Sequence, residues 1–437
     1  MTDETTRQKA RGKAPAPWQT KPFSIMTKPV GPICNLDCTY CYYLEKEKLF
    51  GDSEKFRMSN AMLDKYVREY IQSQSAPEIT FTWQGGEPTL LGIDFFRRAV
   101  DLQEQYGDGR PIHNSLQTNG TLLNDEWAEF FAEKGFLIGL SVDGPADLHD
   151  VYRVDKRQKP TFDRVMRGLE FLKKHGAAFN TLTVVNRKNS KKPLKVYRFL
   201  KEIGSDFIQF IPLVERKPDA SARKWGLDLA APPDLEEENG EHSPVTAWSV
   251  GSIAYGDFLI AVFDEWVRND VGKVFVQIFD VALNNWMGRG SPLCVFAEKC
   301  GRALVMEHNG DVYSCDHYVY PKYKLGNLAE QTLGSMVDAP EQIKFGEDKA
   351  STLPKYCRDC EVRFACNGEC PKHRFMHTPS GEPGLNYLCG GYKKFFNHID
   401  PYMGAMCRLL NEQRAPADVM TLARQWDQQR SRRSARK

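Results

Sequence analysis

Short apolar runs rich in β-branched residues alternate with amphipathic segments over roughly the first half of the chain. The segments between the runs repeat apolar residues at helical spacing, which is typical of βα units around a parallel sheet. Six such repeats predict an α/β fold with a partial (β/α)6 barrel, whose chemistry would lie at the carboxyl ends of the strands. The expected strands are 23–28, 78–84, 113–119, 136–144, 179–186 and 207–214.

Three of the helical segments carry residues that favour helix ends. The helix expected at 59–74 has Ser59 or Asn60 as its cap. The helices expected at 124–135 and 161–176 each end in a glycine. These signals support the alternation of strands and helices.

The pattern changes after the sixth run. Residues 216–247 are rich in Pro, Glu and Asp and poor in branched apolar residues, which is typical of an exposed insertion or lid. Helical spacing returns at 252–270, and 271–288 is expected to form a short strand followed by a helix. These residues would bridge the barrel to a cysteine-rich C-terminal module.

Length and charge narrow the class of protein. The chain has 437 residues, enough for two or three domains, and its formal net charge of +2 does not favour nucleic acid as a partner. No apolar stretch approaches the length of a membrane span, and residues 1–20 lack the apolar core of a signal peptide. We therefore expect a cytoplasmic protein without membrane contact, with a flexible N-terminus and a solvated basic C-terminal tail.

The chain has twelve cysteines, and reduced cytoplasmic thiols favour metal ligation over disulfides. Cys34, Cys38 and Cys41 follow the first expected strand with the spacing C-x3-C-x2-C. Three thiolates hold three corners of a cubane 4Fe-4S cluster and leave one iron open for a ligand, whereas iron-sulfur electron carriers usually supply four. The alternative is a structural zinc site that lacks one of its usual four ligands.

A second group of eight cysteines follows a long stretch that has none. Eight thiolates complete two cubanes without an open iron, as in ferredoxin-type runs in which the last cysteine serves the other cluster. Two zinc sites are the alternative, because spacing alone does not separate zinc from iron-sulfur. Cys407 is left over and is expected to be a buried apolar residue. The eight are Cys294, Cys300, Cys315, Cys357, Cys360, Cys366, Cys370 and Cys389.

The first motif resembles the signature of the radical S-adenosylmethionine (SAM) superfamily. In that family the open iron binds the amino and carboxylate groups of SAM, and an injected electron splits SAM to give a 5'-deoxyadenosyl radical. The resemblance implies further SAM contacts, for which a strand-to-helix turn or a surface ion pair is the plainer explanation. They are Tyr40 at the adenine, Gly86 and Glu87 of "QGGEP" at the methionine amino group, Ser141 and Arg153 at the ribose and carboxylate, and Val214, rather than Leu213, at the adenosyl group.

The eight later cysteines resemble the SPASM domain of peptide-modifying radical SAM enzymes. That resemblance implies two auxiliary 4Fe-4S clusters, and so three clusters in all. The first auxiliary cluster would be held by Cys294, Cys300, Cys315 and Cys370, and the second by Cys357, Cys360, Cys366 and Cys389.

Four longer segments narrow the resemblance to the anaerobic sulfatase-maturating enzymes, over about residues 22–396. They are "CGRALVMEHNGDVYSCDHYVYP", "LGNL", "CPKHRF" and "GEPGLNYLCGGYKKFF". These enzymes oxidise a cysteine or serine side chain of a sulfatase to Cα-formylglycine. The resemblance implies an unfolded or nascent sulfatase polypeptide as substrate, read as an extended segment around a Cys/Ser-x-Pro/Ala-x-Arg motif. It also implies an electron donor such as flavodoxin or ferredoxin.

Three residues match the substrate site of that family. Asp316, directly after Cys315, matches the base proposed for the thiol or hydroxyl proton, although it would otherwise be an ordinary turn residue. Tyr43 and Gln84 match positions that hold the reacting side chain, and packing or turn roles are the alternative. The chain departs from its relatives at Glu369, where a glycine is common, which affects loop shape more than ligand number.

Two other functions remain open. A SPASM enzyme that forms thioether or carbon–carbon crosslinks commonly has an added leader-binding domain, for which the polar residues before the first strand are too few. A non-catalytic iron-sulfur carrier or zinc protein would not need the three-cysteine site. The expected division is a flexible N-terminus 1–20, radical SAM barrel 21–215, insertion 216–247, bridging helices 248–290, SPASM domain 291–395, and C-terminal helix and basic tail 396–437.

Overall fold

The computed structural model describes residues 21–51, 55–234 and 244–434. The expected flexible N-terminus, 1–20, lies outside these residues, and so does 235–243 of the expected insertion. None of the described helices is both long and apolar enough to cross a membrane.

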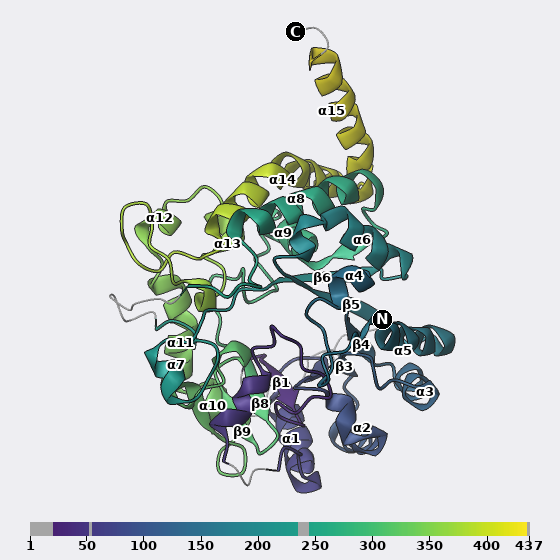
Figure 1. The fold of residues 1–437 in the computed structure, drawn as a ribbon, viewed down its shortest axis with the longest axis vertical. Coiled ribbons are helices and arrows are strands. Elements are labelled where there is room, and N and C mark those ends of the chain that lie inside the picture. The colour runs from purple at the N-terminus through teal and green to yellow at the C-terminus, as the bar shows by residue number, and fades with distance from the viewer. Residues whose placement is uncertain (1–20, 52–54, 235–243, 435–437) are drawn as a thin grey trace, which may run out of the picture.

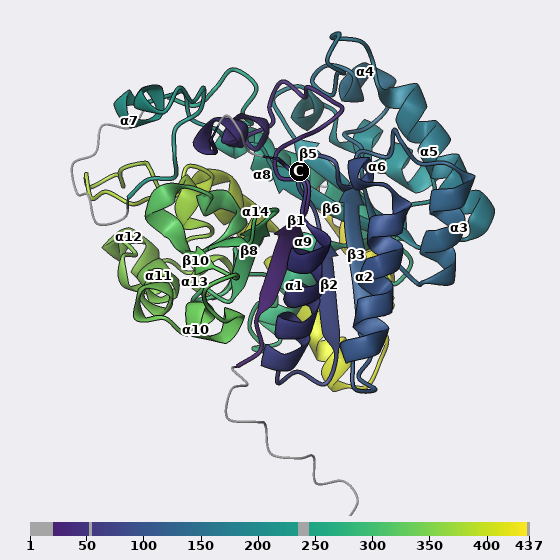
Figure 2. The ribbon, with the colours of Figure 1, turned by 90° about the horizontal axis from the view of Figure 1, so that it is seen from below.

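One mixed sheet runs through the described part of the molecule (Figures 1 and 2). Its strands are β1 Ser24–Lys28, β2 Ile79–Trp83, β3 Ile112–Thr118, β4 Leu137–Ser141, β5 Phe179–Val185, β6 Phe207–Pro212, β7 Phe275–Val276, β8 Ala303–Glu307, β9 Asp311–Tyr313 and β10 Lys324–Asn327. Across the sheet they follow the order β10-β9-β8-β1-β2-β3-β4-β5-β6-β7.

The strands β1 to β6 form the predicted partial barrel. They are parallel, and each pairs with the next along the chain, because each βα unit adds one strand. All six coincide with the expected runs. The sheet does not close, because β1 pairs on its outer side with β8 and β6 pairs with the short β7.

The helices that connect these strands begin and end largely as predicted. The Ser59 hydroxyl accepts a hydrogen bond from Met62 N and so caps α1, and α5 ends at Gly176, whose φ is +71°. Helix α3 ends at Glu133, slightly before the expected glycine. The helices are α1 Asn60–Ser73, α2 Ile93–Tyr106, α3 Asp125–Glu133, α4 Ala146–His149, α5 Phe162–His175 and α6 Pro193–Glu202.

The described part of the insertion packs against the loop that follows the first cysteine motif. It contains the short helix α7, Ala220–Lys224. Lys48 in the 3-10 helix η1, Leu44–Leu49, forms an ion pair with Asp228 at 2.8 Å. Glu45 Oε2 accepts a hydrogen bond from Asp228 N at 2.5 Å. The insertion thus contacts the 3-10 helix that follows the cysteine loop, and its role as a lid stays a prediction.

The cysteine-rich module continues the barrel sheet, which the sequence pattern did not predict. Strand β8 pairs in parallel with β1, with Ser24 opposite Ala303 and Lys28 opposite Glu307. Strands β9 and β10 then follow antiparallel. The two modules therefore share one sheet, and the domain boundaries stay predictions.

Helices from the bridge and the C-terminus pack beside strands β5 and β6 and form one of two large apolar cores. The bridge forms a helix, a short strand and a second helix, as predicted. Helix α14 begins at Cys389, and α15 continues to Ser434 through the expected basic tail and projects from the body (Figure 1). The helices are α8 Ser252–Asn269, α9 Gln277–Trp286, α10 Leu333–Val337, α11 Pro340–Ser351, α12 Lys355–Arg358, α13 Arg363–Cys366, α14 Cys389–Asn411 and α15 Val419–Ser434.

Candidate active site

The first cysteine motif lies in the loop between β1 and η1, at the carboxyl end of the sheet. Burial raises the pKa of Cys34 and of Cys38 to about 12, with a contribution from the neighbouring Cys41 thiol at each. These mutual effects indicate that the three thiols lie near one another. Three thiols placed in this way could serve as the ligands of one cluster, because bound metal ions offset the penalty for burying thiolates.

The "QGGEP" segment packs directly against this loop. Gly86 N donates to Gly31 O at 2.8 Å, and a Cβ on Gly86 would lie 2.0 Å from Ile33 O, so only glycine fits there. The missing side chain at Gly86 thus lets the segment approach the cysteine loop, and its contact with SAM stays a prediction. The segment holds that loop in place.

Glu87 is buried and bonded within the chain. Its Oε1 accepts hydrogen bonds from the hydroxyls of Thr89 and Thr118 at 2.7 and 2.8 Å, and its Oε2 accepts from Asn119 N at 2.8 Å. This carboxylate ties the ends of β2 and β3 together. A SAM contact from the segment would therefore come from its backbone rather than from this side chain.

Arg153 and Tyr40 meet at a buried carboxylate that sequence reasoning had not assigned. Asp143 Oδ2 accepts a hydrogen bond from the Tyr40 hydroxyl at 2.6 Å and lies 3.1 Å from Arg153 Nε. Burial alone would lower the pKa of Arg153, but Asp143, Tyr40 and Cys38 together outweigh burial and raise that pKa above its ordinary value. Asp143 thus fixes two predicted SAM contacts. It lies in the quoted segment "GLSVDG", two residues after Ser141.

The remaining predicted SAM and substrate residues also lie at strand ends. Ser141 is the last residue of β4, and Val214 follows β6 and is buried in the apolar core. Gln84 follows β2, and its Nε2 donates to Gln117 Oε1. This orientation leaves Gln84 Oε1 as a buried acceptor with no hydrogen-bond partner in the described part of the chain.

Asp316 lies at the junction of the two modules. It begins the 3-10 helix η4, Asp316–Tyr318, directly after Cys315. Its Oδ2 accepts a hydrogen bond from the Tyr42 hydroxyl, and its Oδ1 forms an ion pair with Lys28 Nζ. Burial would raise the pKa of Asp316, but Lys28, His317 and the hydrogen bond from Tyr42 together outweigh burial and lower that pKa to about 2. The carboxylate is therefore ionised at neutral pH.

Tyr43, the next residue after Tyr42, contacts the last residues of β1 and β8. Its hydroxyl donates to Glu307 Oε1 at 2.6 Å, and Lys28 Nζ lies 3.4 Å from the centre of its ring. Burial and the charge of Glu307 raise the pKa of Tyr43 well above its ordinary value, so its hydroxyl stays protonated. Lys28, Tyr42 and Glu307 had not been assigned a role from sequence.

The four cysteines assigned to the first auxiliary cluster lie near one another. Cys370 and Cys294 raise the pKa of Cys315, and Cys294 raises that of Cys300, in each case after burial itself. Lys349 is buried beside them and donates to Cys294 O at 2.5 Å. A buried ammonium at this position fits a cluster held by four thiolates, because it offsets their negative charge.

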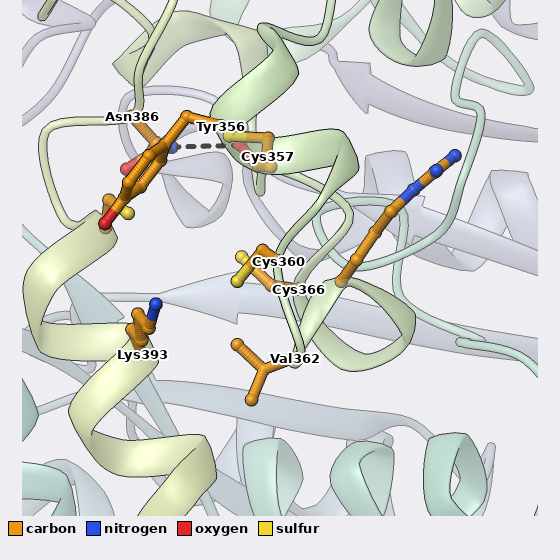
Figure 3. Close-up of a pocket in the computed structure, with 10 residues that line it drawn as sticks. Tyr356, Cys357, Cys360, Val362, Cys366, Asn386 and Lys393 are labelled. Atoms are coloured by element: carbon orange, nitrogen blue, oxygen red, sulfur yellow. Dashed lines mark hydrogen bonds between the residues drawn. The ribbon is translucent and has the colours of Figure 1, made fainter. Parts of the chain in front are cut away.

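The other four cysteines line a pocket between α12, α13 and the start of α14. Figure 3 shows Cys357, Cys360 and Cys366 around this pocket, with Lys393 of α14 at its side. Cys389 also lines it, and Cys357 contributes to raising the pKa of Cys389 after burial. A hollow bounded by four thiols fits a cluster, so the residues present suit the predicted group.

The described residues contain no three His, Cys, Asp or Glu side chains that converge as ligands of a single metal ion would. Cys407 lies near the C-terminal end of α14, outside both groups of four, and is only partly buried, so the expectation of a buried residue was wrong.

The comparisons with known proteins agree with this arrangement. Residues 29–200 match the family model for the radical SAM superfamily, and residues 294–361 match that for an iron-sulfur cluster-binding domain, SPASM. A serine-type anaerobic sulfatase-maturating enzyme of Bacteroides thetaiotaomicron is 50% identical over 92% of this chain and 95% of its own. A cysteine-type anaerobic sulfatase-maturating enzyme of Clostridium perfringens is 32% identical over 87% of this chain and 97% of its own.

Solved structures also resemble this chain over most of its length. The structure described as native anSMEcpe with bound AdoMet and Cp18Cys peptide has a TM-score of 0.76 and 31% sequence identity. The match covers 89% of this chain and 99% of that chain. A likeness at 15% identity to the crystal structure of Streptococcus suis SuiB bound to precursor peptide SuiA, with a TM-score of 0.53, concerns the fold alone.

Proposed function

Because the chain belongs to the anaerobic sulfatase-maturating enzymes, we propose that it oxidises a cysteine or serine side chain of a sulfatase polypeptide to Cα-formylglycine. One observation carries this function. Tyr42, directly after Cys41, donates to Asp316, directly after Cys315, so a carboxylate of the auxiliary module stands beside the SAM-cluster loop. A proton acceptor at that junction suits an oxidation better than a simple electron carrier.

The proposed cofactors are SAM and three 4Fe-4S clusters, one of them at Cys34, Cys38 and Cys41. The two groups of four cysteines in the SPASM module would hold the auxiliary clusters, as their mutual pKa effects support. When bound, these groups supply the hydrogen-atom acceptor and the electron acceptors that a two-electron oxidation needs.

The chain itself supplies the proton acceptor and the positions of the reacting groups. Asp316 accepts the proton of the substrate thiol or hydroxyl, since Lys28 and Tyr42 hold it as a carboxylate. Gln84 Oε1 offers an acceptor to the same side chain, and its amide is fixed by Gln117. Tyr43, held by Glu307, forms a wall of the site.

The substrate is an unfolded or nascent sulfatase segment, because a folded sulfatase would bury its own site. We expect serine to be accepted, since serine-type relatives are 50% and 38% identical to this chain and a cysteine-type relative is 32% identical. The electron donor would be a small carrier such as flavodoxin or ferredoxin. The cytoplasm remains the expected compartment, because twelve reduced cysteines suit it.

The direct test uses paired peptides that contain serine or cysteine at the reacting position. Each is incubated anaerobically with reconstituted protein, SAM and a reductant, and aldehyde and 5'-deoxyadenosine are measured by mass spectrometry. We expect aldehyde from the serine peptide at least. Deoxyadenosine with a thioether or carbon–carbon crosslink instead would favour a crosslinking enzyme, and neither product from protein with intact clusters would contradict the function.

The role of Asp316 is tested in the same assay. Asp316→Asn keeps the size of the side chain but removes the proton acceptor, so we expect aldehyde formation to fall about 100-fold while clusters and SAM cleavage are retained. Cluster content is checked by iron and sulfide analysis. Unchanged aldehyde yield would exclude Asp316 as the base.

A further inference from the structure

We propose that Lys28 is a positioning residue for the oxidation, which sets the carboxylate of Asp316 and the ring of Tyr43 at the junction of the two modules. The inference rests on the proposed function and extends it from the charge of Asp316 to the geometry of the substrate site. Lys28 is the last residue of β1 and is 1% exposed. A buried ammonium is destabilising unless it is paired, so its partners indicate what it does.

The partners of Lys28 are the two residues proposed to act on the substrate. Its Nζ forms an ion pair with Asp316 Oδ1 and lies 3.4 Å from the centre of the Tyr43 ring. The other oxygen of Asp316 is bound by the Tyr42 hydroxyl. Lys28 and Tyr42 therefore hold the carboxylate from two sides, which fixes its direction as well as its position.

The register of the sheet explains why Lys28 can do this. Lys28 lies opposite Glu307 across the β1 and β8 pair, and Glu307 Oε1 accepts the Tyr43 hydroxyl. One pair of neighbouring strand ends thus fixes both Asp316 and Tyr43. A change in this pairing would move both residues at once.

A second lysine near the site has its own partner. Lys372 Nζ lies 4.6 Å from the centre of the Tyr42 ring and forms an ion pair with Glu215 at 2.5 Å. Among the described residues, the ion pair that Asp316 forms is the one with Lys28. Replacing Lys28 should therefore leave Asp316 without a direct cationic partner.

A chemically similar lysine at a distant place provides a matched control. Lys201 forms an ion pair with Asp270 at 2.8 Å and lies 4.7 Å from the centre of the Tyr197 ring, and the Tyr197 hydroxyl donates to Asp270. This lysine, carboxylate and tyrosine lie at α6 and the end of α8. Lys201→Met removes the same kind of network without touching the site.

The test compares the reconstituted wild type with Lys28→Met, Lys28→Arg and Lys201→Met. It measures iron content, affinity for a labelled serine peptide by fluorescence anisotropy, deoxyadenosine and aldehyde. For Lys28→Met we expect iron content and peptide affinity near those of the wild type, and about tenfold less aldehyde per deoxyadenosine. Lys28→Arg should restore part of that ratio because it keeps the charge, and Lys201→Met should keep the full ratio.

Two results would overturn the proposal. One is an unchanged ratio of aldehyde to deoxyadenosine in Lys28→Met. The other is loss of iron, peptide binding and deoxyadenosine together with aldehyde in Lys28→Met, without recovery in Lys28→Arg, which would mean that Lys28 only holds the modules together. Absence of aldehyde from the wild type with every peptide would instead contradict the proposed function.

Discussion

Glu369 has a backbone conformation that glycine adopts more readily than other residues. Its φ is +52°, in the left-handed region, where a side chain adds about 1 kcal/mol of strain. The carboxylate is buried and bonds to His373 Nδ1 at 2.9 Å and Asn386 Nδ2 at 2.7 Å. These bonds account for a glutamate in this left-handed conformation.

The charge of Glu369 should influence the proposed auxiliary clusters. It raises the pKa of Cys366 and of Cys370, one from each group of four, although burial is the larger cause at both. A negative charge nearby disfavours the reduced cluster, so Glu369→Gln should raise the reduction potential of at least one auxiliary cluster by tens of millivolts. An anaerobic redox titration followed by electron paramagnetic resonance measures this.

Glu361→Gln is the control for that experiment. Glu361 also follows a cysteine of the second group, but its side chain is 56% exposed, so solvent screens its charge. We expect a clearly smaller shift than for Glu369→Gln. Equal shifts in the two variants would contradict the importance of the buried charge.

At the level of elements, the crossing of α8 and α14 determines where Cys389 lies. Helix α14 begins at that cysteine, and Gly391 follows it by half a turn. A Cβ at Gly391 would lie 2.0 Å from Ser252 O, and one at Gly256 would lie 2.5 Å from Gly391 O. The two backbones therefore meet because both residues lack a side chain.

Gly391→Ala should force the two helices apart. We expect a loss of about 2–4 kcal/mol in the free energy of unfolding and a lower iron content, because Cys389 moves with the helix. Thermal unfolding and iron analysis measure the two effects. Gly404→Ala on the same helix meets only Arg408 Nη1 at 3.7 Å, so it should keep the iron content and cost no stability, and equal losses in the two variants would argue against the close crossing.

Helix α9 carries a carboxyl that should make stability depend on pH. Burial raises the pKa of Asp280 to about 6. This folded-state pKa lies above the unfolded value, so the folded protein binds the proton of Asp280 more tightly than the unfolded chain does. The protonated carboxyl therefore favours the folded state at low pH, and this stabilisation is lost as pH rises through about 6.

Asp280→Asn should remove this loss of stability at high pH, because the amide does not ionise. We expect the variant to be more stable than the wild type by about 1–2 kcal/mol at pH 8, with the difference shrinking toward pH 5. Thermal unfolding midpoints across that range measure the difference. A difference that does not change with pH would show that the carboxyl is not responsible.

At the scale of the whole molecule, local patterns predicted the barrel but not its junction with the cysteine-rich module. The six strands follow from the alternation of apolar runs and amphipathic segments, which each βα unit carries within itself. The pairing of β1 with β8 joins residues far apart in the sequence, so no local pattern indicates it. For the same reason the sequence indicated only that Lys28 ends a strand. Its ion pair with Asp316 depends on the three-dimensional structure.

The same distinction applies to the site. The spacing of the cysteines separated the first motif from the later eight. The resemblance to SPASM domains then divided those eight into two groups, and the structure places the members of each group near one another. Asp143 lay inside a segment already singled out, but its contacts with Tyr40 and Arg153 depend on how β4 meets the cysteine loop. Buried charge pairs of this kind are formed by tertiary packing, and a single sequence does not show them.

The most direct test of the central claim follows the hydrogen atom that leaves the substrate. A serine peptide with two deuterium atoms on the reacting Cβ is incubated anaerobically with the reconstituted protein, SAM and reductant, and both products are analysed by mass spectrometry. We predict one deuterium in 5'-deoxyadenosine and a formylglycine that retains the other. Deoxyadenosine without deuterium, or a crosslinked peptide that keeps both deuterium atoms, would contradict oxidation at this carbon.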